Sequence, residues 1–224
     1  MNRLKCIKSM VDKCKTAADI GTDHGYVAGM LLKEGICENI IATDLNEGPL
    51  NRAIEHLSSV NLKSKCDFRL GSGLTVLKEG EADAIIIAGM GGDLILDIIE
   101  ASKNIAMKAK QLILQPMTAV DNLRRYLSEN GFEIIDENIV KEYHHFYFII
   151  KAKKGITKQK DSIYYEISKI LIDKKEPVMI DYINKVLNTN EKIISSLEKA
   201  NNVEYNVRIE NLKEKNRIIK ELIK

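Results

Sequence analysis

Hydrophobic and polar positions alternate differently in the two parts of this chain. From residue 16 to about 150, short apolar runs alternate with helical periodicity, which is typical of a parallel sheet covered by helices on both faces. The expected strands are 16–20, 39–45, 66–70, 83–89 and 111–116, and the expected helices are 27–33, 49–60, 94–105 and 120–129. Two more strand-like runs, 132–140 and 142–153, are expected to pair antiparallel at the sheet edge. The pattern predicts an α/β fold with a seven-stranded sheet.

From residue 160 onward the pattern is helical throughout. A helix is expected over 161–174, with Pro177 separating it from two heptad helices around a polar break at 201–204. The first seam is Met179, Ile183, Val186, Asn190, Ile193, Leu197 and Ala200, and the second is Tyr205, Ile209, Leu212, Asn216, Ile219 and Ile223. If the two helices fold back at the polar break, they form an antiparallel coiled-coil hairpin. Asn190 then faces Asn216, and this pair fixes the register of the hairpin. We therefore expect an α/β domain over 1–156 and a helical coiled-coil domain over 157–224.

Composition excludes several classes of protein. No apolar run reaches eighteen residues and the first ten residues lack a signal-peptide core, so we expect a cytoplasmic protein without membrane contact. Four scattered cysteines and dispersed histidines predict reduced thiols and no metal site. The net charge is +2, so the overall charge does not indicate a nucleic-acid binder, and no DNA partner is expected. The expected assembly is a monomer or weak dimer.

Candidate chemistry gathers at the carboxyl ends of the expected strands, where open parallel sheets bind ligands. Strand one ends in DIGTDHGY (19–26), strand two in Asp44-Leu45-Asn46, strand three in Gly71-Ser72-Gly73, and strand four in Ala88-Gly89-Met90-Gly91-Gly92. Gly21 allows close approach of a ligand to the backbone, and Asp44 is placed to accept both ribose hydroxyls of an adenosine. These features fit NAD and S-adenosylmethionine equally well.

Asp23 separates the two cofactors. A dinucleotide brings an anionic pyrophosphate to this turn, where a carboxylate would repel it. S-adenosylmethionine brings a sulfonium and an ammonium group instead, so Asp23 favours the methyl donor. The glycines of 88–92 allow two interpretations, a tight turn before a helix or a bare backbone surface for a planar substrate.

The ordered motifs DIGTDHGY (19–26), ATDLNEGP (42–49), RLGSGL (69–74), AGMGG (88–92) and LILQP (112–116), with the C-terminal coiled coil, resemble the bacterial tRNA (adenine-22-N1)-methyltransferases. Arg3-Leu4 is similar to the Arg-Leu near the start of that family. The resemblance implies that residues 1–156 form a Rossmann-like class I methyltransferase domain. It also implies that the enzyme uses S-adenosylmethionine to methylate N1 of an adenine in the D-arm region of tRNA. Ser72 departs from the aspartate usual in the family, although a hydroxyl can still hydrogen-bond.

The resemblance and the strand-end argument together give two sets of site residues. The expected cofactor-binding residues are Gly21, Asp23, Asp44, Leu45, Gly71, Ser72, Gly73, Ala88, Gly89, Met90 and Gly91. The expected catalytic residues are Asp23, Tyr26, His24 and Asn46. For Asp23 two roles stay open: stabilising charge on the adenine, or capping a helix or binding the methionine ammonium.

The C-terminal hairpin is expected to grip tRNA, helped by Lys151, Lys153, Lys154, Lys158 and Lys160 at its root. Two rival functions stay open at this stage. One is a small-molecule methyltransferase with a dimerising hairpin, and the other is a non-catalytic RNA-binding module. A nicotinamide-dependent reductase ranks below both because of Asp23.

Overall fold

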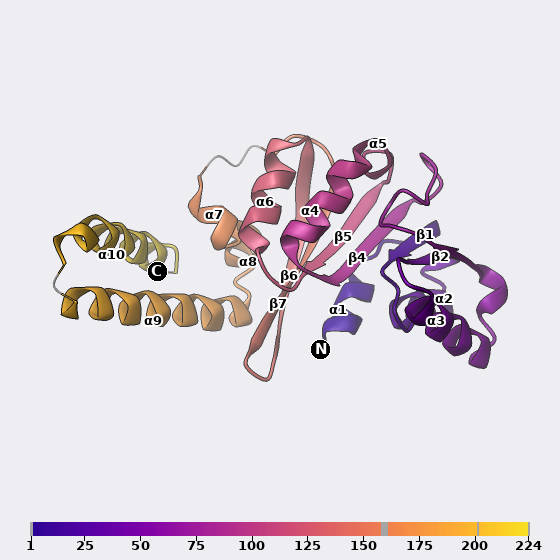
Figure 1. Cartoon of the computed structure of the whole chain (residues 1–224), viewed down its shortest axis with the longest axis horizontal. Coiled ribbons are helices and arrows are strands. Elements are labelled where there is room, and N and C mark those ends of the chain that lie inside the picture. The colour runs from indigo at the N-terminus through magenta and orange to yellow at the C-terminus, as the bar shows by residue number, and fades with distance from the viewer. Residues whose placement is uncertain (1, 158–160, 201, 224) are drawn as a thin grey trace. The chain divides into compact units, whose positions relative to one another are not determined.

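A computed structural model describes residues 2–157, 161–200 and 202–223. The chain divides into two compact units, residues 1–160 and 161–224 (Figure 1). In the first unit the helices are α1 (Arg3–Ser9), α2 (Tyr26–Lys33), α3 (Glu47–Ser59), α4 (Gly92–Ala101), α5 (Lys103–Ala106) and α6 (Val120–Glu129). Its strands are β1 (Cys14–Ile20), β2 (Cys37–Asp44), β3 (Cys66–Leu70), β4 (Ala84–Met90), β5 (Gln111–Pro116), β6 (Phe132–Glu142) and β7 (His145–Lys154).

The seven strands form one sheet in the order β3-β2-β1-β4-β5-β7-β6. The first five are parallel, whereas β7 pairs antiparallel with both β5 and β6. This confirms the Rossmann-like sheet and its antiparallel hairpin at the edge. The strand order reverses between β1 and β4, which is where such sheets bind ligands.

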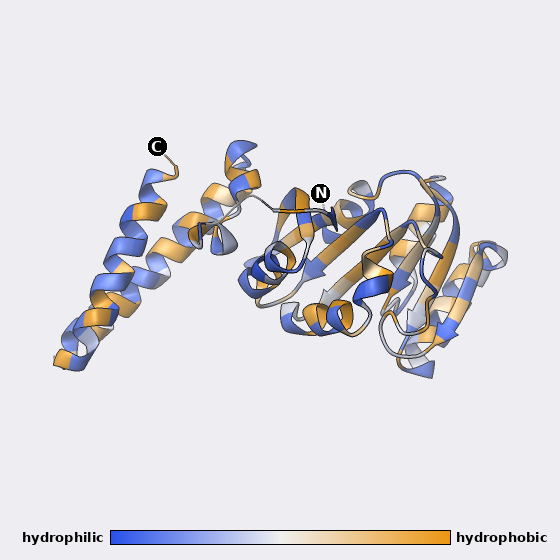
Figure 2. Cartoon of the chain, turned by 90° about the horizontal axis from the view of Figure 1, so that it is seen from above, coloured by the Kyte–Doolittle hydropathy of each residue, from blue (hydrophilic) through white to orange (hydrophobic). Residues whose placement is uncertain are grey.

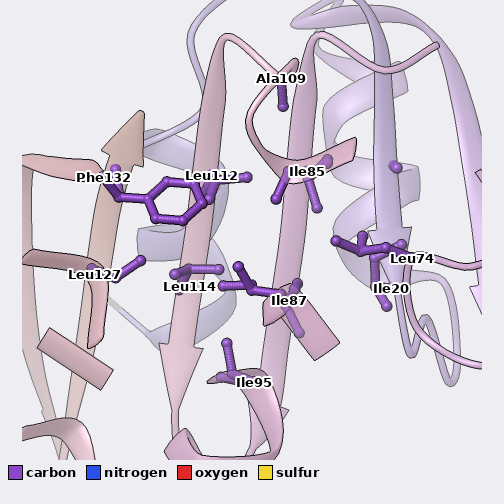
Figure 3. Close-up of a cluster of buried hydrophobic side chains, with 14 of the residues drawn as sticks. Ile20, Leu74, Ile85, Ile87, Ile95, Ala109, Leu112, Leu114, Leu127 and Phe132 are labelled. Carbon is purple, nitrogen blue, oxygen red and sulfur yellow. The ribbon is translucent and has the colours of Figure 1, made fainter. Parts of the chain in front are cut away.

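The central strands are buried on both faces, and for this reason they are almost continuously apolar (Figure 2). Ile85 and Ile87 of β4 point to the face covered by α4 and α6, where Leu127 and Phe132 also lie (Figure 3). Ile86, from the same strand, points to the face covered by α1, α2 and α3. Each fully buried aliphatic side chain of this kind contributes about 1.5–3 kcal/mol.

Three helical details differ from the sequence pattern. Residues 3–9 form the unpredicted helix α1, whose N-terminal amides are capped by the Asn2 side chain, which accepts a hydrogen bond from the Lys5 amide. The helix expected over 94–105 breaks at Ser102, where φ is −140°. Asp93 and Asp121, whose residue type suits the start of a helix, lie in the first turns of α4 and α6, but the N-cap residues are Gly91 and Ala119.

In the second unit the helix expected over 161–174 is also wrong. Two short helices, α7 (Ile163–Glu166) and α8 (Lys169–Asp173), replace it. The chain is extended at the buried Ile167, and the Ser168 hydroxyl then accepts a hydrogen bond from the Leu171 amide and caps α8. A side-chain cap inside an apolar run therefore interrupts the helix.

The long helices α9 (Pro177–Lys199) and α10 (Asn206–Glu221) pack as the expected hairpin. The Asn190 amide donates a hydrogen bond of 2.8 Å to the Asn216 side-chain oxygen, and both residues are buried. The register prediction is confirmed by this contact. The seam is partly wrong, however, because Leu187 and Ile194 are buried where Val186 and Ile193 were expected, and Ala200 is exposed.

Candidate active site

A cavity of about 740 Å³ lies at the carboxyl ends of the strands around the switch point. We call it the strand-end cavity. It is lined by thirteen of the fourteen residues expected from sequence, namely Gly21, Asp23, His24, Tyr26, Asp44, Leu45, Asn46, Gly71, Ser72, Gly73, Ala88, Gly89 and Met90. Gly91 is the exception. These segments meet because parallel strands end at one edge of the sheet.

The turn after β1 lines this cavity at Gly21 and Thr22. Gly21 has a φ of +72°, and a Cβ there would lie 2.2 Å from the Met90 Cε. The Gly21 and Thr22 amides both donate hydrogen bonds to the Thr43 carbonyl, which fixes the turn to the end of β2. Glycine is therefore required for the backbone angle, and its bare surface faces the cavity.

Two carboxylates lie deep in the same cavity. Asp19 is almost fully buried and accepts a hydrogen bond of 2.8 Å from the Thr22 hydroxyl. Burial raises the pKa of Asp19 to about 6, although hydrogen bonds from Thr22 and the Ala28 amide oppose this. Asp44 is 9% exposed and accepts a hydrogen bond of 3.0 Å from the Asn46 amide, which orients its side chain at the end of β2.

Asp23 has a left-handed backbone, with a φ of +47°. It does not cap α2, because the N-cap is Gly25 and no side chain bonds to that helix end. Instead the Arg52 guanidinium, from α3, donates a hydrogen bond of 2.6 Å to the Asp23 carboxylate. The expected role of Asp23 as a helix cap is therefore wrong, and its carboxylate has a cationic partner, Arg52, that the sequence did not predict.

An aromatic row lies beside Asp23. The His24 and Tyr26 rings stack with centroids 5.2 Å apart, and Tyr26 meets His56 edge-on at 5.0 Å. Tyr26 is 48% exposed. This row offers flat, partly exposed surfaces on which a planar base can stack.

The glycines after β4 have separate roles. A Cβ at Gly89 would meet open space, so this residue leaves a bare surface in the cavity. A Cβ at Gly92 would lie 2.3 Å from the Ala119 carbonyl oxygen, so Gly92 lets α4 pack against backbone. Gly91 caps α4 and does not line the cavity. The packing of α4 explains Gly92, and the use of the bare surface at Gly89 by a planar substrate stays a prediction.

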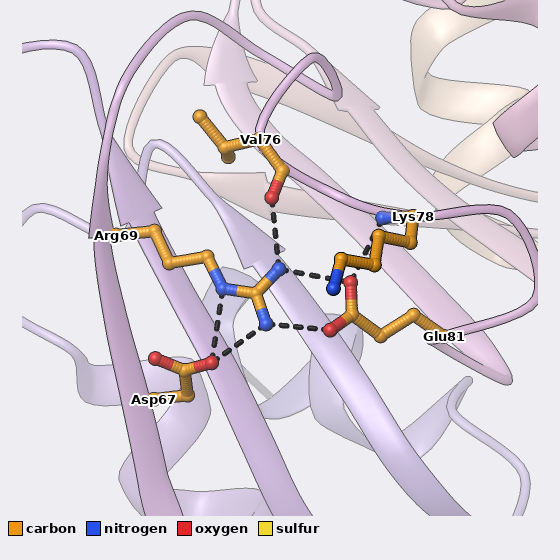
Figure 4. A network of polar contacts seen from close by, with 5 residues as sticks. All are labelled: Asp67, Arg69, Val76, Lys78 and Glu81. Atoms are coloured by element: carbon orange, nitrogen blue, oxygen red, sulfur yellow. Dashed lines mark hydrogen bonds and ion pairs between the residues drawn. The ribbon is translucent and has the colours of Figure 1, made fainter.

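The loop after β3 is held by Arg69 (Figure 4). Its guanidinium donates hydrogen bonds to the Asp67 and Glu81 carboxylates and to the Val76 carbonyl. The bond from Arg69 lowers the pKa of Glu81 to about 2. The network closes the loop that carries Gly71, Ser72 and Gly73, and so fixes their place in the cavity.

Several lining residues were not predicted as site residues. Arg3 and Leu4 enter from α1, Leu94 and Ile98 from α4, and Gln115 and Met117 from the end of β5. Arg3 donates a hydrogen bond of 3.1 Å to the Met117 sulfur. Gln115 could have been found from its place at a strand end, whereas Arg52 carries no sequence signal.

In the part of the chain that the structure describes, no group of three or more His, Cys, Asp and Glu side chains is arranged to bind a metal ion. No described helix is both long enough and apolar enough to span a membrane.

Known proteins resemble this chain over its whole length. A family model described as a methyltransferase domain matches residues 1–150. The tRNA (adenine(22)-N(1))-methyltransferase of Bacillus subtilis (strain 168) is 31% identical over 230 residues, which cover 99% of this chain and 95% of the relative. The chain belongs to this methyltransferase family.

Solved structures agree with the methyltransferase assignment. The crystal structure of the B. subtilis M1A22 tRNA methyltransferase TrmK has a TM-score of 0.88 and 28% identity, and covers 100% of this chain and 98% of that one. The crystal structure of Streptococcus pneumoniae Sp1610, a putative tRNA (m1A22) methyltransferase, in complex with S-adenosyl-L-methionine has a TM-score of 0.82 and 30% identity. The match covers 99% of this chain and 98% of that one. The likeness to these structures therefore includes the C-terminal helices as well as the methyltransferase domain.

Proposed function

We propose that this chain transfers a methyl group from S-adenosylmethionine to N1 of adenine 22 in tRNA. The observation that carries the proposal is the strand-end cavity, which brings the ordered family motifs to one place at the switch point of the sheet. The 31% identity with the B. subtilis enzyme over nearly the whole chain supports the same substrate. Since the substrate is tRNA, the proposal places the reaction in the cytoplasm.

The residues of the strand-end cavity fit S-adenosylmethionine, which supplies an electrophilic methyl group. At Gly21 and Gly89 the backbone is bare and can approach a ligand closely. A Cβ at Gly21 would leave less room for that ligand. Asp44 would accept the ribose hydroxyls, and Ser72 would hydrogen-bond near the adenine. Asp19 and Asp23 supply negative charge for a cationic ligand, where a pyrophosphate would be repelled.

Adenine N1 needs no strong base, because its in-plane lone pair is free at neutral pH. The chain must hold N1 about 3–3.5 Å from the methyl carbon and in line with the bond that breaks. Positive charge enters the adenine ring as the new bond forms. The Asp23 carboxylate would stabilise this charge, and His24, Tyr26 and Asn46 would orient the base.

We assign residues 1–156 to catalysis and 157–224 to gripping tRNA. N1 lies on the pairing edge of adenine, so the target base must leave its pair before methylation. One expected contribution to tRNA binding is wrong. Lys151 is 8% exposed and forms a 2.6 Å ion pair with Asp12, so its ammonium group is already paired within the first unit and is not available to RNA. Lys158 and Lys160 lie outside the described residues.

The test is incubation with labelled S-adenosylmethionine and unmodified tRNA, followed by nucleoside analysis. We expect 1-methyladenosine in wild-type tRNA and none in a transcript with adenine 22 replaced by guanine. Methylation of metabolites but not tRNA would favour a small-molecule enzyme. Binding of tRNA without any binding of the methyl donor would favour a non-catalytic module.

A further inference from the structure

A second cavity, of about 600 Å³, lies between α1, α2 and α3, and we call it the helix groove. Its apolar lining comes from Leu4, Met30, Val60 and Leu62. Val60 is 46% exposed, so its side chain lies open at the groove. The groove is therefore an open apolar surface on the catalytic unit.

Tyr26 lines both the strand-end cavity and the helix groove. Its ring is stacked with His24 on the side of the strand-end cavity and meets His56 of the groove edge-on. The aromatic row therefore runs without interruption from one cavity to the other. A strand of nucleic acid with one base in the strand-end cavity would bring its next base to this row.

Gly29 keeps the floor of the groove open. It lies inside α2, where glycine is a poor helix former, and its φ is not in the left-handed region. A Cβ there would be 3.4 Å from Leu57 and 3.5 Å from His56, which are ordinary contacts. The backbone therefore does not require glycine, but a side chain at this position would occupy groove space.

Two lysines, Lys5 of α1 and Lys33 of α2, also line the groove. Both are exposed, and within residues 2–157 no described carboxylate forms an ion pair with either ammonium group. The neighbouring Lys8, in contrast, is paired with Glu34 at 2.7 Å. Unpaired lysines beside an apolar and aromatic groove match the charge of a phosphodiester and the faces of a base.

We propose that the helix groove binds a nucleotide of the tRNA next to the adenine that is methylated. Its base stacks on the aromatic row at His56, and its phosphates lie against Lys5 and Lys33. Binding this neighbour would hold the strand open while the target base enters the strand-end cavity. The inference rests on the proposed function, because it takes tRNA as the substrate.

The test compares full-length variants in tRNA methylation at several salt concentrations. His56→Ala should raise the KM for tRNA about tenfold, the effect expected from one lost stacking contact. The double variant Lys5→Ala/Lys33→Ala should lower the slope of log KM against log salt by about 1.5. Gly29→Ala should raise KM while thermal stability is kept or increased, since alanine is the better helix former. The Kd of S-adenosylmethionine should stay within twofold of wild type in every variant.

Lys108→Ala is the matched control, because Lys108 is an exposed lysine beyond α5 that lines neither cavity. Wild-type KM and salt slope in all groove variants, with an active wild-type enzyme, would overturn the groove proposal alone. A wild-type enzyme that leaves unmodified tRNA unmethylated would overturn the proposed function instead. A dimer in sedimentation that His56→Ala abolishes would place a second copy in the groove and also overturn the proposal.

Discussion

At the scale of single residues, the charge on Asp23 matters most. The carboxylate is paired with Arg52 at 2.6 Å, and both side chains are about half exposed, so solvent screens this pair strongly. We expect Asp23→Asn to lower kcat by about 10²-fold, because one electrostatic contact to the charged ring is lost. The Kd of S-adenosylmethionine, measured by calorimetry, should change by less than about threefold.

Arg52→Ala is the control for this substitution. It removes the partner of Asp23 but keeps the carboxylate, so kcat should fall less than in Asp23→Asn. A loss of cofactor affinity in Asp23→Asn with unchanged kcat for bound substrate would instead assign Asp23 to the methionine ammonium.

The raised pKa of Asp19 makes the free energy of unfolding depend on pH. Its pKa is raised from 3.8 to about 6 by burial, so between these values the folded chain keeps a proton that the unfolded chain has lost. The contribution of Asp19 to the free energy of unfolding is therefore largest below pH 4 and decreases as the pH rises through 6. This contribution is measured as the difference in thermal stability between wild type and Asp19→Asn at several pH values between 4.5 and 7.5. A stability difference between the two proteins that does not vary with pH would contradict this assignment.

The residues of the site could largely be found from sequence, since strand ends converge in a parallel sheet and the motifs mark those ends. What could not be found depends on packing between elements. Arg52 reaches Asp23 only because α3 lies beside the turn after β1. Arg3 reaches the cavity because of the unpredicted helix α1.

At the scale of elements, the Arg69 network stabilises the loop after β3. Arg69 and Glu81 are each about three-quarters buried, and Glu81 also accepts a hydrogen bond from the Lys78 amide. We expect Arg69→Ala to lower the free energy of unfolding by about 1–3 kcal/mol, because it leaves these groups without their partner. Urea denaturation gives this number. Arg69→Lys keeps the charge but not the forked geometry, so it should recover only part of the loss.

The α9–α10 hairpin depends on its asparagine pair. Asn190→Leu leaves the Asn216 side chain buried without its partner, and should lower the stability of the hairpin by about 1–3 kcal/mol. Adding Asn216→Leu should restore stability, because an apolar pair needs no hydrogen bond, although register is then specified less strictly. Helical circular dichroism during urea unfolding follows both variants. A double variant no more stable than Asn190→Leu would show that the amide contact itself holds the hairpin.

The apolar runs predicted the strands, because the central strands are buried on both faces. Helical periodicity predicted the long helices, because each of them buries one face. The pattern did not predict the point at which one polar side chain ends or starts a helix. Ser168 caps α8 inside an apolar stretch and divides the expected helix in two. In α9 a wider apolar face, including Leu187 and Ile194, replaces the strict heptad seam.

At the scale of the whole molecule, tRNA binding is expected to need both units. On α9, Lys192 and Lys199 border a shallow polar depression. If this face contacts phosphates, Lys192→Glu/Lys199→Glu should weaken tRNA binding and lower its salt slope by about 1.5, with no effect on the Kd of S-adenosylmethionine. Filter binding over a range of salt concentrations measures this. An unchanged slope would remove this face of α9 from the tRNA contact.

Two methionine sulfurs border the strand-end cavity. The Met90 Cε lies where a side chain on Gly21 would be, and the Met117 sulfur accepts a hydrogen bond from Arg3. Oxidation to the sulfoxide would add a polar oxygen to either one and change the shape of the cavity. We therefore expect oxidised enzyme to lose activity, and methionine sulfoxide reductase, not a thiol reductant, to restore it.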